Sequence, residues 1–387
     1  MSSPAPRLAS IDVFRAITMF LMIFVNDLWT LKEIPAWLEH TQAKEDGMGL
    51  ADTVFPAFLF IVGLSIPFAI TGRLAKGQSK KIIIGHILFR GIALLVMGFF
   101  HVNLESYNSE AALLPKPFWQ ILLTLSFFLI WLDYPRNTGK NKSRWLQGVG
   151  IALLVFLAIV YKGNNGEWMQ PHWWGILGLI GWSYLLCAII FVLANGRLAI
   201  TIAALAFFLL FNIAAHAGWL NFLQPVKEYI WIVGDGAMPA LVLAGVLAAQ
   251  LYSSSKRIFL PLALIAAAFL AGGFLLRPYW GISKIMATPS WVMICTAISI
   301  LFFAALIFIT DINKKHNWFS IIRPAGTSTL TAYLLPYIHY ALYSLAGISL
   351  PLMLRTGMVG IIKSLLYALV IILITGLLEK WKLRLKI

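Results

Sequence analysis

Twelve long apolar runs, separated by short polar connections, leave few folds open to this sequence. A helix that crosses a bilayer needs about 20 mainly apolar residues, and backbone polar groups in lipid must find partners inside the protein. These two rules predict helices rather than open strands. The runs occupy residues 10–31, 50–71, 83–103, 117–133, 147–161, 174–194, 198–216, 237–253, 258–276, 291–310, 325–345 and 358–378.

The composition favours a membrane protein over a soluble one. Of the 387 residues, 60% are hydrophobic and 12% are charged, whereas soluble domains carry about 25% charged residues. No polar segment is long enough to form a separate soluble domain. We therefore expect an all-α polytopic membrane protein in which residues 1–387 form a single transmembrane domain, a bundle of about 11–12 helices.

The basic residues predict the orientation of the chain in the bilayer. The net charge is +15, but lysine and arginine lie in short connections rather than along one face or tail, so no nucleic-acid partner is expected. With Met1 in the cytoplasm, 19 basic residues fall in cytoplasmic segments and 8 in outer loops. This excess follows the positive-inside rule. It predicts that both termini are cytoplasmic and that the first loop faces outward.

Ionisable side chains within the apolar runs are candidates for function, because such groups are costly in lipid. Asp12 and Arg15 lie three residues apart on the first helix, share a face and can pair. Their pairing has a purely structural alternative, in which it only positions the helix at the interface. Arg90 lies in the third run, one turn after His86. Its guanidinium either contacts a phosphate or extends to the cytoplasmic surface, and the sequence leaves both open.

The polar loop between the first two runs brings together the groups best suited to chemistry. Asn26 ends the first run, Asp52 opens the second, and His40 lies between them. Histidine is the side chain best matched to moving protons near neutral pH. Helix capping also explains Asn26 and Asp52, and a lone loop histidine is often only solvated. No histidine pair has metal-binding spacing, so no metal is expected.

Several motifs in this region have a familiar order and spacing. Leu8–Arg15, with the sequence LASIDVFR, is followed by an apolar run that ends at Asn26; His40 and then Gly49–Gly63 come next. In these features the chain resembles the heparan-α-glucosaminide N-acetyltransferase family of transmembrane acyltransferases, as a bacterial-type homologue. The later pieces that fit are Thr288–Trp291, Asp311, Arg323–Gly326 and Tyr333.

The resemblance implies a membrane enzyme that uses acetyl-CoA as its co-substrate. The acetyl group would pass from cytosolic acetyl-CoA to a glucosamine-like amino sugar, or a glycan carrying one, on the outer side. From Asp12 to Asn26 is 14 residues, which corresponds to about 21 Å of helix rise. A carrier with a long flexible arm can bridge that distance. The implied location is a bacterial inner (plasma) membrane with the catalytic loop outward, and a homodimer is possible.

The resemblance also implies roles for individual residues. The family's catalytic histidine falls on His40 and its active-site asparagine on Asn26, a donor for the developing oxyanion. Asp52, Asp12 and Arg15 are expected to support them. His40 either takes the proton of the amine or carries the acetyl group itself, and the sequence leaves both routes open. The residues expected at the CoA end are Arg15, Arg90, His86 and Arg323.

Two other classes of protein compete with this interpretation. Charges within membrane helices also mark the paths of transporters, although here the polar groups cluster at the ends of one helix pair rather than at the midplane of matched halves. An O-acyltransferase that modifies a cell-envelope glycan is the second alternative. Related acyltransferases of that kind place a histidine near the end of the first helix. This chain has Asn26 and Asp27 there, which counts against this alternative.

Overall fold

A computed structural model describes residues 8–135, 138–227, 229, 234–254, 257–315 and 317–387. Each of the twelve expected runs is helical, and ten helices in the described part of the chain are long and apolar enough to cross a membrane. The other two, α4 (Lys116–Trp131) and α13 (Thr329–Leu345), have 16 and 17 residues. The prediction of an all-α polytopic membrane protein is confirmed. Three of the basic residues counted above, Arg7, Arg136 and Lys256, lie outside the described residues.

The chain divides into two compact units. The first comprises Met1–Thr18, Pro35–Leu94 and Leu179–Ser320, and the second comprises Met19–Ile34, Leu95–Gly178 and Ile321–Ile387. The boundary between the units falls within three helices, α1 (Ala9–Asp27), α3 (Lys80–Asn103) and α6 (Ile176–Leu193). The interpretation of residues 1–387 as one functional domain stays a prediction.

In the first unit, α2 (Leu50–Ala75) packs against α9 (Ala237–Ser254). Two glycines allow the backbones to approach closely. A Cβ atom on Gly63 would lie 1.8 Å from the carbonyl oxygen of Val242, and one on Gly245 would lie 2.0 Å from that of Phe60. Small residues at such crossings are typical of membrane helices, where close van der Waals packing replaces the hydrophobic effect.

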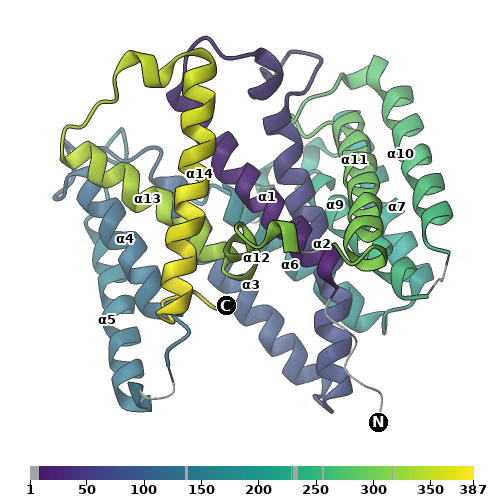
Figure 1. Ribbon diagram of the computed structural model, residues 1–387, viewed down its shortest axis with the longest axis horizontal. Helices are drawn as coiled ribbons and strands as arrows, with labels where there is room; N and C mark the ends of the chain where they lie inside the picture. Colours follow the sequence, from purple (N-terminus) through teal and green to yellow (C-terminus); the bar gives the residue numbers. More distant parts are fainter. Residues whose placement is uncertain (1–7, 136–137, 228, 230–233, 255–256, 316) are drawn as a thin grey trace. The chain divides into compact units, whose positions relative to one another are not determined.

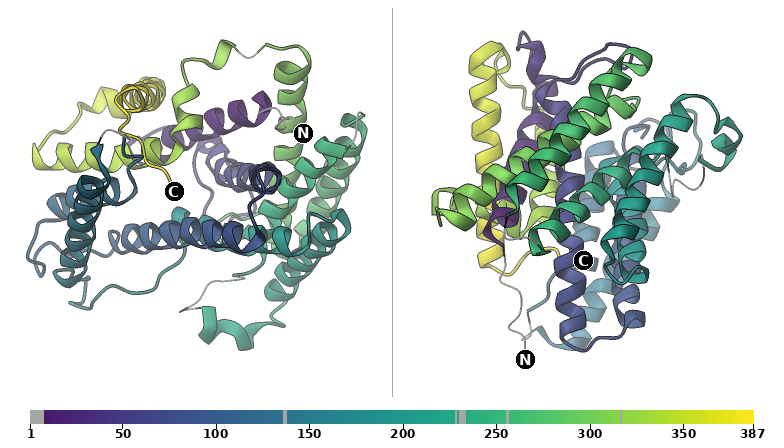
Figure 2. Two further views of the ribbon diagram at one scale, coloured as in Figure 1. Left: turned by 90° about the horizontal axis from the view of Figure 1, so that it is seen from below. Right: turned by 90° about the vertical axis from the view of Figure 1, so that its right-hand side faces the viewer.

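Two further helix pairs belong to this unit. Helix α10 (Phe259–Trp280) runs beside α11 (Pro289–Leu306), as Figure 1 and Figure 2 show, and α7 (Leu198–His216) packs on α9. After α11, a π-helical turn (Ile307–Ile312) carries Asp311 to the first turn of α1. There the Asp311 carboxylate accepts hydrogen bonds from the backbone N–H of Ser10 (3.1 Å) and from its hydroxyl (2.6 Å). Asp311 therefore caps the start of the first helix.

The second unit contains α4, α5 (Lys140–Ile159), α12 (Arg323–Thr327), α13 and α14 (Gly357–Lys380). Helix α4 packs on α5 and α13, and α14 packs on α12 and α13 (Figure 1). The indole of Trp119, which is 0% exposed, donates a hydrogen bond to the carbonyl oxygen of Leu157 (3.0 Å). This bond links the first turn of α4 to the last turn of α5.

A buried carboxylate joins three helices of this unit. Asp27, at the end of α1, is 3% exposed. It accepts hydrogen bonds from the hydroxyls of Tyr340 on α13 and Ser364 on α14, each at 2.6 Å, and from the ammonium of Lys363 at 2.7 Å. A buried charge with an ionic partner and two further donors is fully satisfied. Asp27 therefore holds α1, α13 and α14 together rather than facing a substrate.

Candidate active site

Two loop segments of the first unit, residues 40–49 and 281–288, are joined through Asp46. Its carboxylate accepts hydrogen bonds from the backbone N–H of Ile282 (2.7 Å) and from Nε of Arg277 (2.9 Å). Desolvation favours the neutral acid, but these two hydrogen bonds and the charge of Arg277 hold the pKa of Asp46 below its ordinary value. The ionised carboxylate thus holds the second loop against the first.

His40 and Asp52 form a hydrogen-bonded pair at the start of α2. Oδ1 of Asp52 lies 2.7 Å from Nδ1 of His40, and Oδ2 accepts the backbone N–H groups of Thr41 and Gly49, each at 3.0 Å. The bond from Gly49 confirms that Asp52 also caps the helix. Because an ionised carboxylate only accepts hydrogen bonds, we assign the Nδ1 hydrogen to the bond with Asp52. The lone pair of Nε2 is then available for chemistry.

The pair combines a fixed carboxylate with an accessible imidazole. The side chain of Asp52 is 1% exposed, whereas that of His40 is 44% exposed. A buried carboxylate that fixes the tautomer and orientation of a histidine is the arrangement that general-base and nucleophilic sites use. The sequence predicted both residues, and the structure brings them into direct contact.

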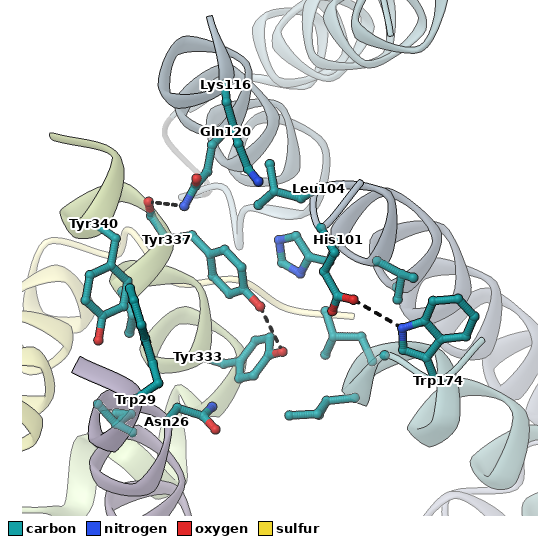
Figure 3. A pocket seen from close by; sticks show the side chains of 18 of the residues that line it. Asn26, Trp29, His101, Leu104, Lys116, Gln120, Trp174, Tyr333, Tyr337 and Tyr340 are labelled. Atoms are coloured by element: carbon teal, nitrogen blue, oxygen red, sulfur yellow. Dashed lines mark hydrogen bonds between the residues drawn. The ribbon is translucent and has the colours of Figure 1, made fainter. Parts of the chain in front are cut away.

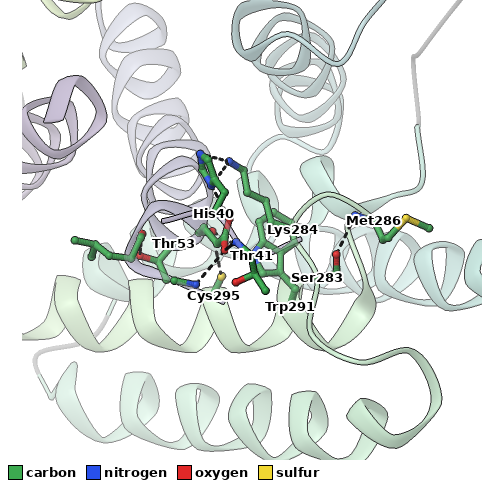
Figure 4. Close-up of polar contacts among 11 residues, drawn as sticks. His40, Thr41, Thr53, Ser283, Lys284, Met286, Trp291 and Cys295 are labelled. Atoms are coloured by element: carbon green, nitrogen blue, oxygen red, sulfur yellow. Dashed lines mark hydrogen bonds and ion pairs between the residues drawn. The ribbon is translucent and has the colours of Figure 1, made fainter. Parts of the chain in front are cut away.

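Lys284 is a third member of this group and is absent from the site predicted from the sequence. Its Nζ lies 3.2 Å from Nδ1 and 3.3 Å from Nε2 of His40. Figure 4 shows the two side chains pointing toward each other. Burial lowers the pKa of Lys284, and the nearby carboxylate of Asp52 partly opposes that shift. Because Nζ is nearly equidistant from the two ring nitrogens, the lysine ammonium lies beside the imidazole ring. Lys284 therefore places a positive charge close to the reactive nitrogen.

The motif Thr288–Trp291 contacts the backbone of Asp52 in the His40–Asp52 pair. Pro289 is the first residue of α11, a position where its missing N–H costs nothing. Trp291, which is 0% exposed, donates its indole N–H to the carbonyl oxygen of Asp52 at 3.1 Å. This bond fixes the first turn of α11 against the first turn of α2, so the motif positions Asp52.

Asp12 and Arg15 pair as predicted. Nη1 of Arg15 lies 3.4 Å from Oδ1 of Asp12, and Nη2 donates a hydrogen bond to the hydroxyl of Ser65 at 2.7 Å. Both charged side chains are 24% exposed. These contacts attach the first part of α1 to α2, as the structural alternative raised above requires.

The remaining residues expected at the CoA end lie on exposed surfaces. His86 and Arg90 are both exposed on α3, and the guanidinium of Arg90 lies 5.0 Å from the ring centroid of Tyr184, a cation–π distance. Arg323, the first residue of α12, is exposed in the second unit. Their contact with CoA stays a prediction.

Asn26 belongs to the second unit, whereas His40 belongs to the first. Its exposed side chain lines a cavity of about 550 Å³ within the second unit, which is drawn in Figure 3. Aromatic side chains such as Trp29 and Tyr333 line the same cavity. The role of Asn26 as an oxyanion donor stays a prediction.

Comparison with known proteins places the chain in a family. A family model described as a domain of unknown function, DUF5009, matches residues 7–232, more than half of the chain. The chain belongs to this family. The match includes the loop of His40 and Asp52 but ends before Lys284.

Two curated relatives are similar to a shorter part of the chain. Heparan-alpha-glucosaminide N-acetyltransferase of Homo sapiens is 38% identical over 107 residues, which is 27% of this chain and 15% of the human protein. The enzyme of the same name from Mus musculus is 37% identical over 105 residues, which is 26% of this chain and 15% of the mouse protein. The chain thus matches only a small part of these relatives' length.

Proposed function

We propose that this protein is a membrane-embedded acetyltransferase that moves an acetyl group from acetyl-CoA to the amine of a glucosamine-like sugar. One observation carries the proposal: Asp52, buried and hydrogen-bonded at 2.7 Å, orients the accessible imidazole of His40. The partial likeness to two acetyltransferases supports the choice of reaction. Their name supports an amino-sugar acceptor.

The chemistry requires a base and a group that stabilises negative charge. The amine nitrogen attacks the carbonyl carbon of the thioester, and the C–N bond forms as the C–S bond breaks. Nε2 of His40 accepts the proton that the amine loses and returns it to the departing CoA sulfur. In the alternative route, Nε2 attacks the thioester, the C–S bond breaks and CoA leaves as the thiolate; the amine then takes the acetyl group from Nε2, and the proton that the amine loses ends on the thiolate. The hydrogen bond from His40 to Asp52 suits either route, because Asp52 stabilises the positive imidazolium.

Lys284 has a place in this chemistry as a positioning and charge-stabilising group. When an acyl group approaches Nε2, the ammonium now 3.3 Å from that nitrogen can donate to the carbonyl oxygen, where negative charge develops. Lysine is a flexible point charge. Its removal should therefore cost less than the roughly 10²–10³-fold in kcat that a rigid oxyanion donor supplies.

We expect Lys284→Met to lower the acetyl-transfer rate about 10-fold, through loss of this electrostatic interaction. Lys284→Arg should retain most of the rate, because the charge is kept. The lowered pKa of Lys284 means that its charge is lost at a lower pH than that of an ordinary lysine. Activity that needs the ammonium therefore falls as the pH rises through the pKa of Lys284. Because arginine stays charged, Lys284→Arg should move this fall in activity to higher pH. An identical pH–rate profile in the arginine variant would contradict this role.

The phosphates of CoA are expected at the cytoplasmic ends of the helices. Arg15, Arg90, His86 and Arg323 are the proposed contacts, because charge-assisted arginine–phosphate bonds are strong. The excess of basic residues in the segments assigned to the cytoplasm supports acetyl-CoA on that side and the catalytic loop on the other. A bacterial inner membrane remains our expectation for the location.

Purified protein in sealed liposomes tests this function directly. Acetyl-CoA labelled in the acetyl group is supplied on one face and glucosamine on the other. We expect labelled N-acetylglucosamine on the glucosamine side, in the vesicles whose orientation exposes the cytoplasmic termini to acetyl-CoA. Glucose, which has hydroxyls but no amine, is the matched acceptor. Labelling of glucose instead of glucosamine would favour O-acyl transfer, and labelling of neither sugar would overturn the proposal.

A further inference from the structure

The cavity in the second unit has the size and lining of a small-molecule site. Its volume of about 550 Å³ lies within the 300–1,000 Å³ typical of ligand pockets. Its walls come from four segments, namely the end of α1, the connection from α3 to α4 with their adjoining turns, the start of α6, and α13. In the predicted topology the end of α1, the connection from α3 to α4 and the start of α6 face outward, which is the side assigned to the acceptor. Helix α13 lines the cavity with residues from its middle, Tyr333 to Tyr340.

Aromatic side chains provide the flat surfaces of the cavity. Trp29 and Trp174 are 74% and 58% exposed. Trp29 lies beside Tyr340 of α13, and Trp174 lies across the cavity from the tyrosines (Figure 3). The rings of Tyr333 and Tyr337 lie close, with their hydroxyls 3.2 Å apart. The C–H faces of a pyranose ring are apolar and pack on such rings, while its hydroxyls need polar partners at the edges. An aromatic cavity with polar edges suits a sugar.

The polar edges are supplied by side chains of several kinds. The carboxylate of Glu105 accepts a hydrogen bond from the indole N–H of Trp174 at 3.3 Å, which holds the carboxylate at the edge of that ring. Lys116 and Asn26 line other parts of the wall. Gln120 donates its amide N–H to the carbonyl oxygen of Tyr337 at 2.7 Å. Its carbonyl oxygen remains an acceptor for a ligand hydroxyl.

His101 marks the inner wall of the cavity. It is 8% exposed and stacks on Tyr337, with ring centroids 4.2 Å apart and planes at 9°. In the described part of the chain neither of its ring nitrogens has a hydrogen-bond partner. A buried polar group without a partner is costly, so a bound molecule that completes this hydrogen bonding would be favoured.

The charges of the cavity argue against the nucleotide end of CoA as its occupant. Among the described side chains that line it, Glu105 and Lys116 are the two that carry a formal charge at neutral pH. A nucleotide with several phosphates requires clustered cations. One carboxylate and one ammonium instead fit a ring that carries a single amine and several hydroxyls.

We infer that this cavity binds the acceptor amino sugar, with the ring against Trp174 and the protonated amine on Glu105. The inference rests on the proposed function for the identity of the acceptor. When the sugar binds, Glu105 contacts its amine in the protonated form. The amine must lose this proton before it attacks a thioester. Glu105 is therefore a specificity-determining residue, which selects an amine over a hydroxyl at one position of the ring.

Calorimetric titration of the full chain in detergent, without acetyl-CoA, tests this binding apart from catalysis. We expect Glu105→Gln to raise the Kd for glucosamine about 10-fold or more, since a hydrogen bond between two charged groups is stronger than one to a neutral amide. The Kd for glucose should be unchanged. Trp174→Leu should raise the Kd of both sugars, because both lose the aromatic ring against which they pack. Glu110→Gln is the matched control, since Glu110 lies on the same connection and is exposed outside the cavity lining.

Distinct results separate this site from the proposed function. An unchanged Kd for glucosamine in Glu105→Gln would overturn the site, even if acetyl transfer were found. Displacement of bound glucosamine by CoA, with Trp174→Leu weakening CoA binding instead, would assign the cavity to the acyl donor. If glucosamine binding depends on Glu105 but no acetylated product ever forms, the site stands and the transferase function fails.

Discussion

Replacing His40 with alanine should lower acetyl transfer to glucosamine by about 10²-fold or more, the lower range for loss of a general base. The variant should still fold, because His40 is a loop residue with its side chain 44% exposed. It should also still bind acetyl-CoA, whose nucleotide end is expected on the cytoplasmic side. Steady-state rates, thermal unfolding and calorimetric titration with acetyl-CoA check these three outcomes separately.

A second variant tests the pair rather than the single residue. In Asp52→Asn the amide can place its NH₂ group against Nδ1 of His40, so the ring hydrogen moves to Nε2 and the base is lost. The Asp52→Asn loss should not add to that of His40→Ala, because the two residues serve one step. Thr41→Ala is the matched control: Thr41 contacts Asp52 through its backbone N–H alone. A His40→Ala protein that transfers acetyl groups at the parent rate would exclude the mechanism.

The helices of this protein can be predicted because the bilayer imposes a simple rule on length and hydropathy. That rule does not predict the break at Ser328, which divides the run at 325–345 into α12 and α13. At this residue φ is −130° and ψ is 45°. The rule concerns hydrophobicity, and this break follows a short Arg-Pro-Ala-Gly segment whose backbone geometry depends on the local turn. The run therefore contains a helix of 17 residues rather than one continuous span.

The candidate site is predictable only where its members are close in the sequence. His40 and Asp52 are 12 residues apart and lie in one loop, so their chemistry is visible from composition and position. Lys284 is 244 residues from His40. No local pattern distinguishes it from other basic residues of outer loops, and it reaches His40 because Asp46 joins the two loops. Long-range contacts of this kind depend on the folded loops.

Asp27 illustrates the opposite case, a residue whose position suggests chemistry but whose contacts indicate stability. It follows Asn26 at the end of the first helix, next to the loop that carries His40 and Asp52. Its carboxylate is 4% exposed and is bound to Lys363, which is 18% exposed. Removal of one partner from a buried ion pair leaves an uncompensated charge, which costs about 3–5 kcal/mol.

We therefore expect Asp27→Ala to lower the free energy of unfolding by about 3–5 kcal/mol, with any loss of activity following the loss of folded protein. The double variant Asp27→Asn/Lys363→Met should recover much of that stability, because it removes both charges while two hydroxyl donors, from Tyr340 and Ser364, keep an acceptor. Thermal and denaturant unfolding of the purified variants in detergent measure the stability of the single and the double variant. Should Asp27→Ala unfold at the parent temperature yet lose acetyl transfer, Asp27 would belong to the chemistry and its contacts with α13 and α14 would be secondary.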